Sequence, residues 1–198
     1  MPSRVEAIVS LIPEKIKIVY DLCCDLGLIG KTIDKLRAID KIIYIDSNEK
    51  IKGLQNFICA DAREFVFSNE PDVCYVIAGI GGKLAIEIFD NILNCNQDVN
   101  KVFIFCVNRD HEELKEKLSA IANVKQQIFY IKEGSYSYEV IQVSLPRHVE
   151  EIVINDLAAE LDFYQKKIRH LSYKKDNFSN TWLNKYKHRQ EKLIIHNN

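Results

Sequence analysis

The chain has 198 residues, of which 47% are hydrophobic and 28% are charged, a composition that supports a globular core. Its length fits one α/β domain with a small appendage better than two complete domains. The formal net charge of −1 excludes a global electrostatic attraction to nucleic acid or to a membrane. No run reaches the ~18 apolar residues of a membrane span, and no signal-peptide pattern opens the chain, so we expect a cytoplasmic protein without a membrane partner.

Helical and strand-like segments alternate along most of the chain. The first helix is expected over Ser3–Ile12, with Ser3 as its N-cap. Five strands are expected at Ile16–Asp21, Lys41–Asp46, Phe57–Asp61, Asp72–Ala78 and Val102–Val107. Further helices are expected at Leu28–Leu36, Ala62–Phe67, Lys83–Leu93 and Glu112–Ile121. Two last strands, Val124–Lys132 and Tyr136–Leu145, are expected to pair antiparallel around a short turn.

This alternation predicts an α/β fold, a Rossmann-like, doubly wound and mostly parallel sheet with an antiparallel final strand. The strands are almost continuously apolar, which fits a sheet that is buried on both faces. We expect residues 1–146 to form this domain and residues 147–198 to form a C-terminal helical, coiled-coil-like extension.

The helical extension is basic. From Phe163 to Asn198 the sequence has nine lysines or arginines and two acidic residues. Such an end on a nearly neutral protein indicates a polyanionic partner. The candidates for phosphate contacts are Lys174, Lys175, Lys185, Lys187 and Arg189. A solvated helical face explains these residues equally well.

Acidic residues and glycines follow the predicted strands, where α/β sheets bind ligands. Asp21, Asp46 and Asp61 end or follow the first three strands, and Gly79, Gly81 and Gly82 follow the fourth. Each residue alone is explained by a helix cap or a turn. Together they favour a nucleotide-containing cofactor, because a carboxylate accepts hydrogen bonds from ribose hydroxyls or from an adenine amine, and glycine lets a ligand approach the backbone.

The loop after the first strand favours S-adenosylmethionine over the other nucleotide cofactors. A dinucleotide-binding loop has the pattern G-x-G-x-x-G, and here Cys23 and Asp25 stand where its first glycines would be. A carboxylate at Asp25 repels a pyrophosphate but suits an amino group and a sulfonium. The chain also lacks the G-x-x-x-x-G-K-[ST] loop of ATP-binding proteins. The predicted cofactor-binding residues are Asp21, Cys23, Asp25, Gly27, Asp46, Asp61, Ala62 and Ala78.

At these residues the chain resembles the bacterial tRNA (adenine-22, N1) methyltransferase family of the TrmK type. The segment from Asp21 to Gly30 is similar to D-x-x-x-D-H-G-x-L-G, and the segment from Ile77 to Gly82 is similar to I-A-G-M-G-G. Ser3-Arg4-Val5 loosely resembles the opening S-K-R-L, and Tyr138-Glu139-Val140 resembles Y-E-I. The resemblance covers most of the first 145 residues. One departure is Leu26, which stands where the family has a histidine.

The resemblance implies a class I methyltransferase that methylates N1 of an adenosine in tRNA. By this comparison the cofactor site is lined by Asp21, Asp25, Gly27, Asp46 and Asp61. The target base is bordered by Gly79, Gly81 and Gly82. Further candidates are Arg4 and Glu139. Adenine N1 already has a lone pair, so catalysis needs alignment more than deprotonation. Asp25 is the first candidate for stabilising the positive charge as it moves from sulfur to the ring.

Two other functions fit the same sequence. One is a catalytically silent RNA-binding or scaffold protein of the same fold, and the other is a small-molecule methyltransferase whose extension serves dimerisation. The six cysteines contain no C-x-x-C pair, and the five histidines show no metal-ligand spacing, so we expect no metal and free thiols in a reducing compartment.

Overall fold

The computed structural model describes residues 3–51, 53–95, 100–121, 124–145, 156–174 and 176–196. The chain divides into two compact units. The first comprises Pro2–Ile128 and Val140–Ile152, and the second comprises Met1, Phe129–Glu139 and Val153–Asn198. The predicted domain boundary after residue 146 lies outside the described residues and stays a prediction. The tip of the last strand pair groups with the C-terminal helices.

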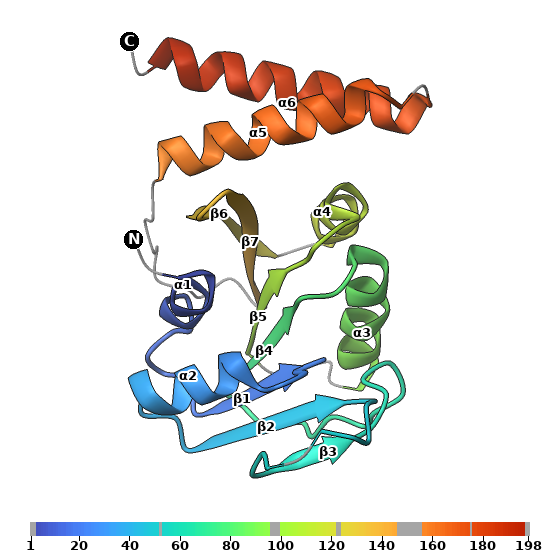
Figure 1. The fold of residues 1–198 in the computed structure, drawn as a ribbon. Coiled ribbons are helices and arrows are strands. Elements are labelled where there is room, and N and C mark those ends of the chain that lie inside the picture. Colours follow the sequence, from blue (N-terminus) through green and yellow to red (C-terminus); the bar gives the residue numbers. More distant parts are fainter. Residues whose placement is uncertain are drawn as a thin grey trace. The chain divides into compact units, whose positions relative to one another are not determined.

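A seven-stranded sheet in the order β3-β2-β1-β4-β5-β7-β6 organises the fold (Figure 1). The strands are β1 (Ile18–Leu22), β2 (Lys41–Asp46), β3 (Phe57–Cys59), β4 (Val73–Ala78), β5 (Lys101–Cys106), β6 (Lys125–Glu133) and β7 (Tyr136–Leu145). Neighbouring strands from β3 to β5 are parallel, and β7 runs antiparallel to β5. This topology confirms the predicted doubly wound, mostly parallel sheet with an antiparallel end.

Helices cover both faces of the sheet in the first unit. α1 (Arg4–Ser10) and α2 (Leu28–Leu36) lie on one face, and α3 (Gly82–Cys95) and α4 (His111–Ser119) lie on the other (Figure 1). The connection from β1 to β2 and the connection from β4 to β5 move in opposite directions along the sheet. Because both crossovers are right-handed, they place α2 and α3 on opposite faces. The order of the strands therefore reverses between β1 and β4, and doubly wound folds bind ligands at this position.

The start of α1 agrees with its predicted N-cap. The Ser3 hydroxyl accepts a hydrogen bond of 3.2 Å from the Glu6 N–H, and Glu6 Oε2 accepts one of 2.7 Å from the Ser3 N–H. This reciprocal capping box satisfies two backbone donors that the first helical turn leaves without a partner.

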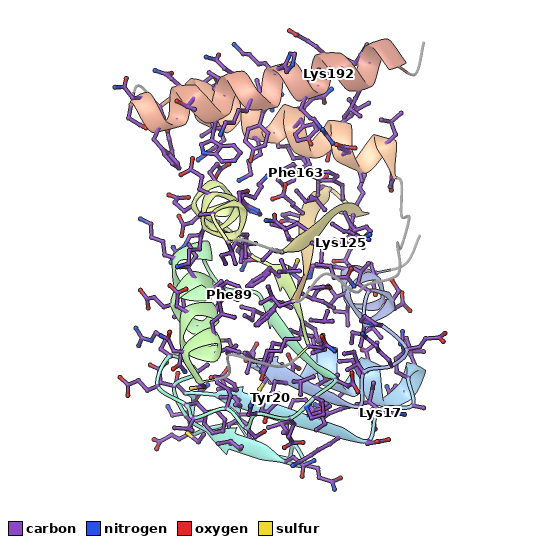
Figure 2. All side chains as sticks on the ribbon, turned by 180° about the vertical axis from the view of Figure 1, so that it is seen from behind. Lys17, Tyr20, Phe89, Lys125, Phe163 and Lys192 are labelled. Atoms are coloured by element: carbon purple, nitrogen blue, oxygen red, sulfur yellow. The ribbon has the colours of Figure 1, made fainter. Side chains whose placement is uncertain are left out.

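Aromatic rings fill the core on the α3 face. Tyr20 stacks on Tyr75, and Tyr75 stacks on Phe103, with ring centroids 5.2 Å apart in both pairs. Phe89 of α3 packs edge-on against Phe103 at 4.8 Å (Figure 2). Such pairs contribute about 0.5–1.5 kcal/mol beyond their buried area, so they fix the three central strands and α3 relative to one another.

The helix predicted at Ala62–Phe67 is wrong. The Glu64 and Phe65 N–H groups both donate to the Asp61 carbonyl at 3.0 Å, which makes a single turn and no helix. Phe67 is buried, and its ring lies 5.5 Å from Tyr20. Burying that side chain requires the chain to leave the helical path after one turn.

The second unit is built on two helices, α5 (Leu157–Ser172) and α6 (Asn177–His196), which lie side by side (Figure 1). They confirm the predicted helical pair. Phe163, Tyr164, Trp182 and Tyr186 form its apolar core together with Tyr130. No helix in the described part of the chain is both long and apolar enough to span a membrane.

Candidate functional site

A small pocket lies at the carboxyl ends of the parallel strands. Its lining includes Cys23 after β1, Asp46 and Ser47 at the end of β2, Asp61 and Ala62 after β3, and Leu84 of α3. The structure therefore brings together four residues that the sequence predicted for the cofactor site: Cys23, Asp46, Asp61 and Ala62. Arg63 also lines the pocket and was not among the residues predicted from the sequence.

Asp21 anchors the loop that follows β1. Its side chain is only 2% exposed, and Oδ2 accepts a hydrogen bond of 2.9 Å from the Gly30 N–H. Burial raises the pKa of Asp21 to about 7, and the negative charge of Asp46 adds to this effect. Asp21 is thus placed to hold the first turn of α2 against β1.

The loop from Cys23 to Gly27 keeps a glycine-like backbone at three positions. The φ angles are +55° at Cys23, +46° at Asp25 and +68° at Gly27. Side chains other than glycine rarely adopt this left-handed region, and each such residue costs on the order of 1–2 kcal/mol. The two positions at which the sequence lacks the expected glycines therefore retain the conformation that glycine favours.

Asp46 connects this loop to β2. Its Oδ2 accepts a hydrogen bond of 3.0 Å from the Asp25 N–H, and its Oδ1 accepts one of 2.9 Å from the Asn48 N–H. A carboxylate can accept about four hydrogen bonds, so each oxygen of Asp46 has room for one further donor. The Asp25 side chain itself is exposed.

Two leucines next to Asp25 are exposed to solvent. Leu26, which replaces the histidine of the TrmK-type pattern, is 63% exposed, and Leu28 is 61% exposed. Leu26 contributes its carbonyl oxygen to a 2.8 Å hydrogen bond from Lys31 Nζ. Position 26 thus presents an apolar side chain at the loop surface.

Asp61 is engaged by Arg63. Arg63 Nε lies 3.0 Å from Oδ1 and 3.1 Å from Oδ2, and Nη2 lies 2.6 Å from Oδ2. This guanidinium holds the pKa of the Asp61 carboxyl below its usual range. The only trace of this pair in the sequence is the spacing of an acid and an arginine two residues apart.

The three glycines after β4 have different surroundings. A Cβ at Gly82 would lie 2.2 Å from the Asp110 carbonyl oxygen, and one at Gly81 would lie 2.8 Å from Arg109 Nε. Close packing against the backbone of the loop after β5 explains Gly82, whereas the side chain that faces Gly81 is the 82% exposed Arg109, which can move aside. Gly79 differs, because its φ is +79° and no atom lies within 4 Å of the position that a Cβ would occupy. Of the three, Gly79 has the open space that an approaching ligand requires.

The loop after β5 supports this glycine segment. Asn108 Nδ2 donates to the Gly79 carbonyl at 2.6 Å, and the Asn108 N–H donates to the Ile80 carbonyl at 2.8 Å. Asn108 was not among the predicted residues, although an asparagine after a buried strand is a signal that the sequence contains. Ala78, predicted for the cofactor site, pairs with Cys106 of β5 and is partly buried.

The predicted RNA-binding residues of the second unit are exposed where they are described. Lys174, Lys185, Lys187 and Arg189 lie at the surface, and Lys175 lies outside the described residues. Lys185 Nζ is 4.2 Å from the centre of the Trp182 ring, and Arg189 Nε is 3.7 Å from Glu160 Oε1. Arg4, in the first unit, is partly buried at the start of α1.

Glu139 belongs to a buried network in the second unit. It is 1% exposed and accepts a hydrogen bond of 3.2 Å from the Tyr130 hydroxyl. That hydroxyl lies 2.8 Å from the Tyr164 hydroxyl, which donates to Glu160 at 2.9 Å. The network joins the strand tip to α5 within this unit. These contacts favour a structural role for Glu139.

Among the described residues, no group of three or more histidine, cysteine, aspartate or glutamate side chains has a metal-binding arrangement. All six cysteines are free thiols.

Comparison with known proteins agrees with this architecture. Residues 1–141 match the family model described as a methyltransferase domain. TrmK of M. capricolum, in complex with S-adenosyl-homocysteine, is 16% identical, with a TM-score of 0.62 over 99% of this chain and 97% of that chain. The B. subtilis M1A22 tRNA methyltransferase TrmK is 16% identical, with a TM-score of 0.61 over 98% of this chain and 97% of that chain.

A Streptococcus pneumoniae protein in complex with S-adenosyl-L-methionine is 15% identical, with a TM-score of 0.66 over 98% of this chain and all of that chain. No curated protein matches the chain in sequence. At these identities the likeness shows the fold. The TrmK-type resemblance seen in the sequence motifs is thus matched by structural neighbours over the full chain.

Proposed function

Because the chain belongs to the methyltransferase domain family, we propose that it transfers a methyl group from S-adenosylmethionine to N1 of an adenosine in tRNA. The observation that carries this proposal is the pocket at the carboxyl ends of the strands, which unites Cys23, Asp46, Asp61 and Ala62. Structural neighbours that bind S-adenosylmethionine or its product, and one that modifies tRNA, support the choice of cofactor and substrate.

The residues present suit this cofactor better than a phosphate-containing one. Asp46 and Asp61 line the pocket, and Asp25 lies in the loop after β1. Their carboxylates favour hydroxyl, amine and ammonium groups over phosphates. S-adenosylmethionine supplies a methyl group that its sulfonium makes electrophilic. Asp46 has lone pairs left for ribose hydroxyls. Asp61 would accept from the adenine amine. Asp21 and Gly27 shape the loop that holds the rest of the molecule.

The target base would be received beside Gly79 and the exposed Asp25. Adenine N1 needs no general base, so the chain's task is to hold the base in line and to exclude water. The methylated ring is cationic, and the Asp25 carboxylate would stabilise charge that develops there. A paired adenine must first leave its stack, at a cost of a few kcal/mol. Gly82, which packs against the backbone of the loop after β5, would keep the turn after β4 rigid at this border, beside Gly81.

The helical extension would supply phosphate contacts through its basic residues: the exposed Lys174, Lys185, Lys187 and Arg189, and Lys175, which lies outside the described residues. Arg4 is a further candidate in the first unit. We place the activity in the cytoplasm, where tRNA is available and where six free thiols remain reduced.

The experiment that tests this proposal starts with calorimetric titration of S-adenosylmethionine into the purified protein. Micromolar binding, followed by methylation of a tRNA transcript that blocks primer extension at one adenosine, would support it, because a methyl group on N1 prevents base pairing. Asp25→Asn is the informative variant, since its backbone N–H still reaches Asp46. At a saturating cofactor concentration it should lower turnover by about tenfold or more, because the negative charge beside the reacting ring is lost.

If the folded protein binds tRNA but not S-adenosylmethionine, the proposed methyltransferase activity is wrong, and a catalytically silent RNA-binding protein is favoured. Methylation of small molecules without any effect of tRNA would favour the small-molecule enzyme.

A further inference from the structure

Arg63 occupies the part of the pocket that the proposed function assigns to the adenine amine. It follows Asp61 in the turn after β3, and its side chain lines the pocket. Three contacts of 2.6 to 3.1 Å join its guanidinium to the Asp61 carboxylate. The Arg63 backbone N–H adds a fourth hydrogen bond, 2.9 Å to Oδ1.

These contacts use the accepting capacity of Asp61. A carboxylate offers about four lone-pair positions, and Arg63 supplies donors to both oxygens. An incoming amine therefore competes with the guanidinium for Asp61. The competition is not prohibitive, because the Arg63 and Asp61 side chains are 48% and 33% exposed and a solvent-exposed ion pair is weak.

The Arg63 guanidinium also contacts a second carboxylate, that of Glu87. Arg63 Nη1 lies 3.3 Å from Glu87 Oε2, and Glu87 belongs to α3, which supplies Leu84 and Ile88 to the pocket lining. Glu87 is 56% exposed and can follow a small movement of the guanidinium. Arg63 is thus shared between a carboxylate at the adenine end of the pocket and one outside it.

We propose that Arg63 is a latch on the adenine subsite, which holds Asp61 in the free protein and moves onto Glu87 when the cofactor binds. This inference rests on the proposed function. Opening the latch breaks the guanidinium contacts to Asp61 and keeps the contact to Glu87, so part of the binding free energy is used to move Arg63. The latch lowers the affinity for the cofactor. It also makes cofactor binding depend on the position of α3, because Glu87 belongs to that helix.

Calorimetry with S-adenosylhomocysteine on four proteins tests the latch: wild type, Arg63→Ala, Glu87→Gln and the double variant. Arg63→Ala should bind about three- to fivefold more tightly, the effect of removing an exposed ion pair. Glu87→Gln should bind about twofold more weakly, because Arg63 loses its second partner. The double variant should resemble Arg63→Ala, since Glu87 acts through Arg63.

Arg37→Ala is the matched control for the loss of one positive charge, because Arg37 caps the C-terminal end of α2. This variant should bind S-adenosylhomocysteine with the wild-type affinity. If wild type binds S-adenosylhomocysteine and folded Arg63→Ala binds it equally well or more weakly, the latch is wrong and the proposed function stands. Absence of binding in wild type and in every variant would overturn the proposed function and the latch together. Binding by Arg63→Ala alone would support both.

Discussion

The side chain of Asp46 at the end of β2 accepts a 3.0 Å hydrogen bond from the backbone N–H of Asp25, in the loop after β1. The contact links two residues that the sequence proposes for different roles, one toward ribose and one toward the reacting base. The Asp25 backbone that donates this bond has the left-handed conformation, with a φ of +46°. Under the proposed function, cofactor binding at Asp46 would therefore be coupled to the Asp25 backbone through this hydrogen bond.

Asp46→Ala should reduce the affinity for S-adenosylmethionine at least tenfold and lower the free energy of unfolding by about 1 kcal/mol. The substitution removes the proposed ribose acceptor and leaves the Asp25 and Asn48 N–H groups without their partner. Calorimetry and urea unfolding measure the two effects. Asp40→Ala, an exposed acid just before β2, is the control and should change neither. Unaltered cofactor binding by Asp46→Ala would remove Asp46 from the site.

Cys23→Gly should stabilise the protein by up to about 1 kcal/mol, because glycine adopts a φ of +55° without steric cost. For a domain of this size the expected rise in melting temperature is about 2–4 °C. Cys23→Ala is the matched control, since it also removes the thiol but keeps the Cβ. A gain by both variants would mean that the thiol, and not the backbone, is the unfavourable feature.

Periodicity predicted the strands well because buried parallel strands are nearly continuous apolar runs. Lys41–Asp46 and Leu28–Leu36 have the predicted bounds, and the antiparallel end is correct. The short helix at Ala62–Phe67 was wrong because burial of Phe67 overrides a weak local preference.

The site residues that could be predicted from the sequence are the acidic residues at the ends of strands. Asp46 and Asp61 meet in one pocket because parallel strands end at the same edge. Arg63 and the packing reason for Gly82 were not predictable, since both depend on contacts across the fold that a sequence pattern does not contain. The glycine-like φ at Asp25 was equally hidden, because the residue type there disfavours it.

The stability should depend on pH through Asp21, whose pKa rises from 3.8 to about 7 on folding. Between these values the folded protein retains a proton that the unfolded chain releases. The contribution of Asp21 to the free energy of unfolding should therefore be largest below about pH 4 and should fall by up to about 4 kcal/mol as the pH rises to 7. Urea unfolding of wild type and Asp21→Asn isolates this effect, because asparagine can still accept from Gly30. An unchanged difference between the two proteins from pH 5 to pH 8 would contradict it.

Lys187→Ala should weaken tRNA binding and reduce the slope of log affinity against log salt by about one, the value for one lost phosphate contact. Trp182 is the chain's only tryptophan and lies under Lys185, so its fluorescence reports binding to α6. Lys35→Ala, on α2 in the first unit, is the control for net charge. A slope that does not change would identify the basic face of α6 as solvated surface.

The glycines offer a comparison between packing and ligand approach. Gly79 and Gly53 have φ angles of +79° and +80°, and no atom lies within 4 Å of a Cβ at either position. Gly79→Ala and Gly53→Ala should therefore lose similar stability, about 1 kcal/mol each. Only Gly79→Ala should also lose methyl transfer, because the new methyl group enters the space proposed for the target base.

Gly82→Ala should behave differently, with a loss of stability of about 2 kcal/mol or more. Its new Cβ would meet the Asp110 carbonyl oxygen at 2.2 Å, and backbone cannot move aside cheaply. Urea unfolding separates this variant from the other two, and a methylation assay on the folded fraction separates Gly79 from Gly53. Equal activity of Gly79→Ala and Gly53→Ala would show that the target base does not approach the turn after β4, and the site for it would have to be sought nearer Leu26.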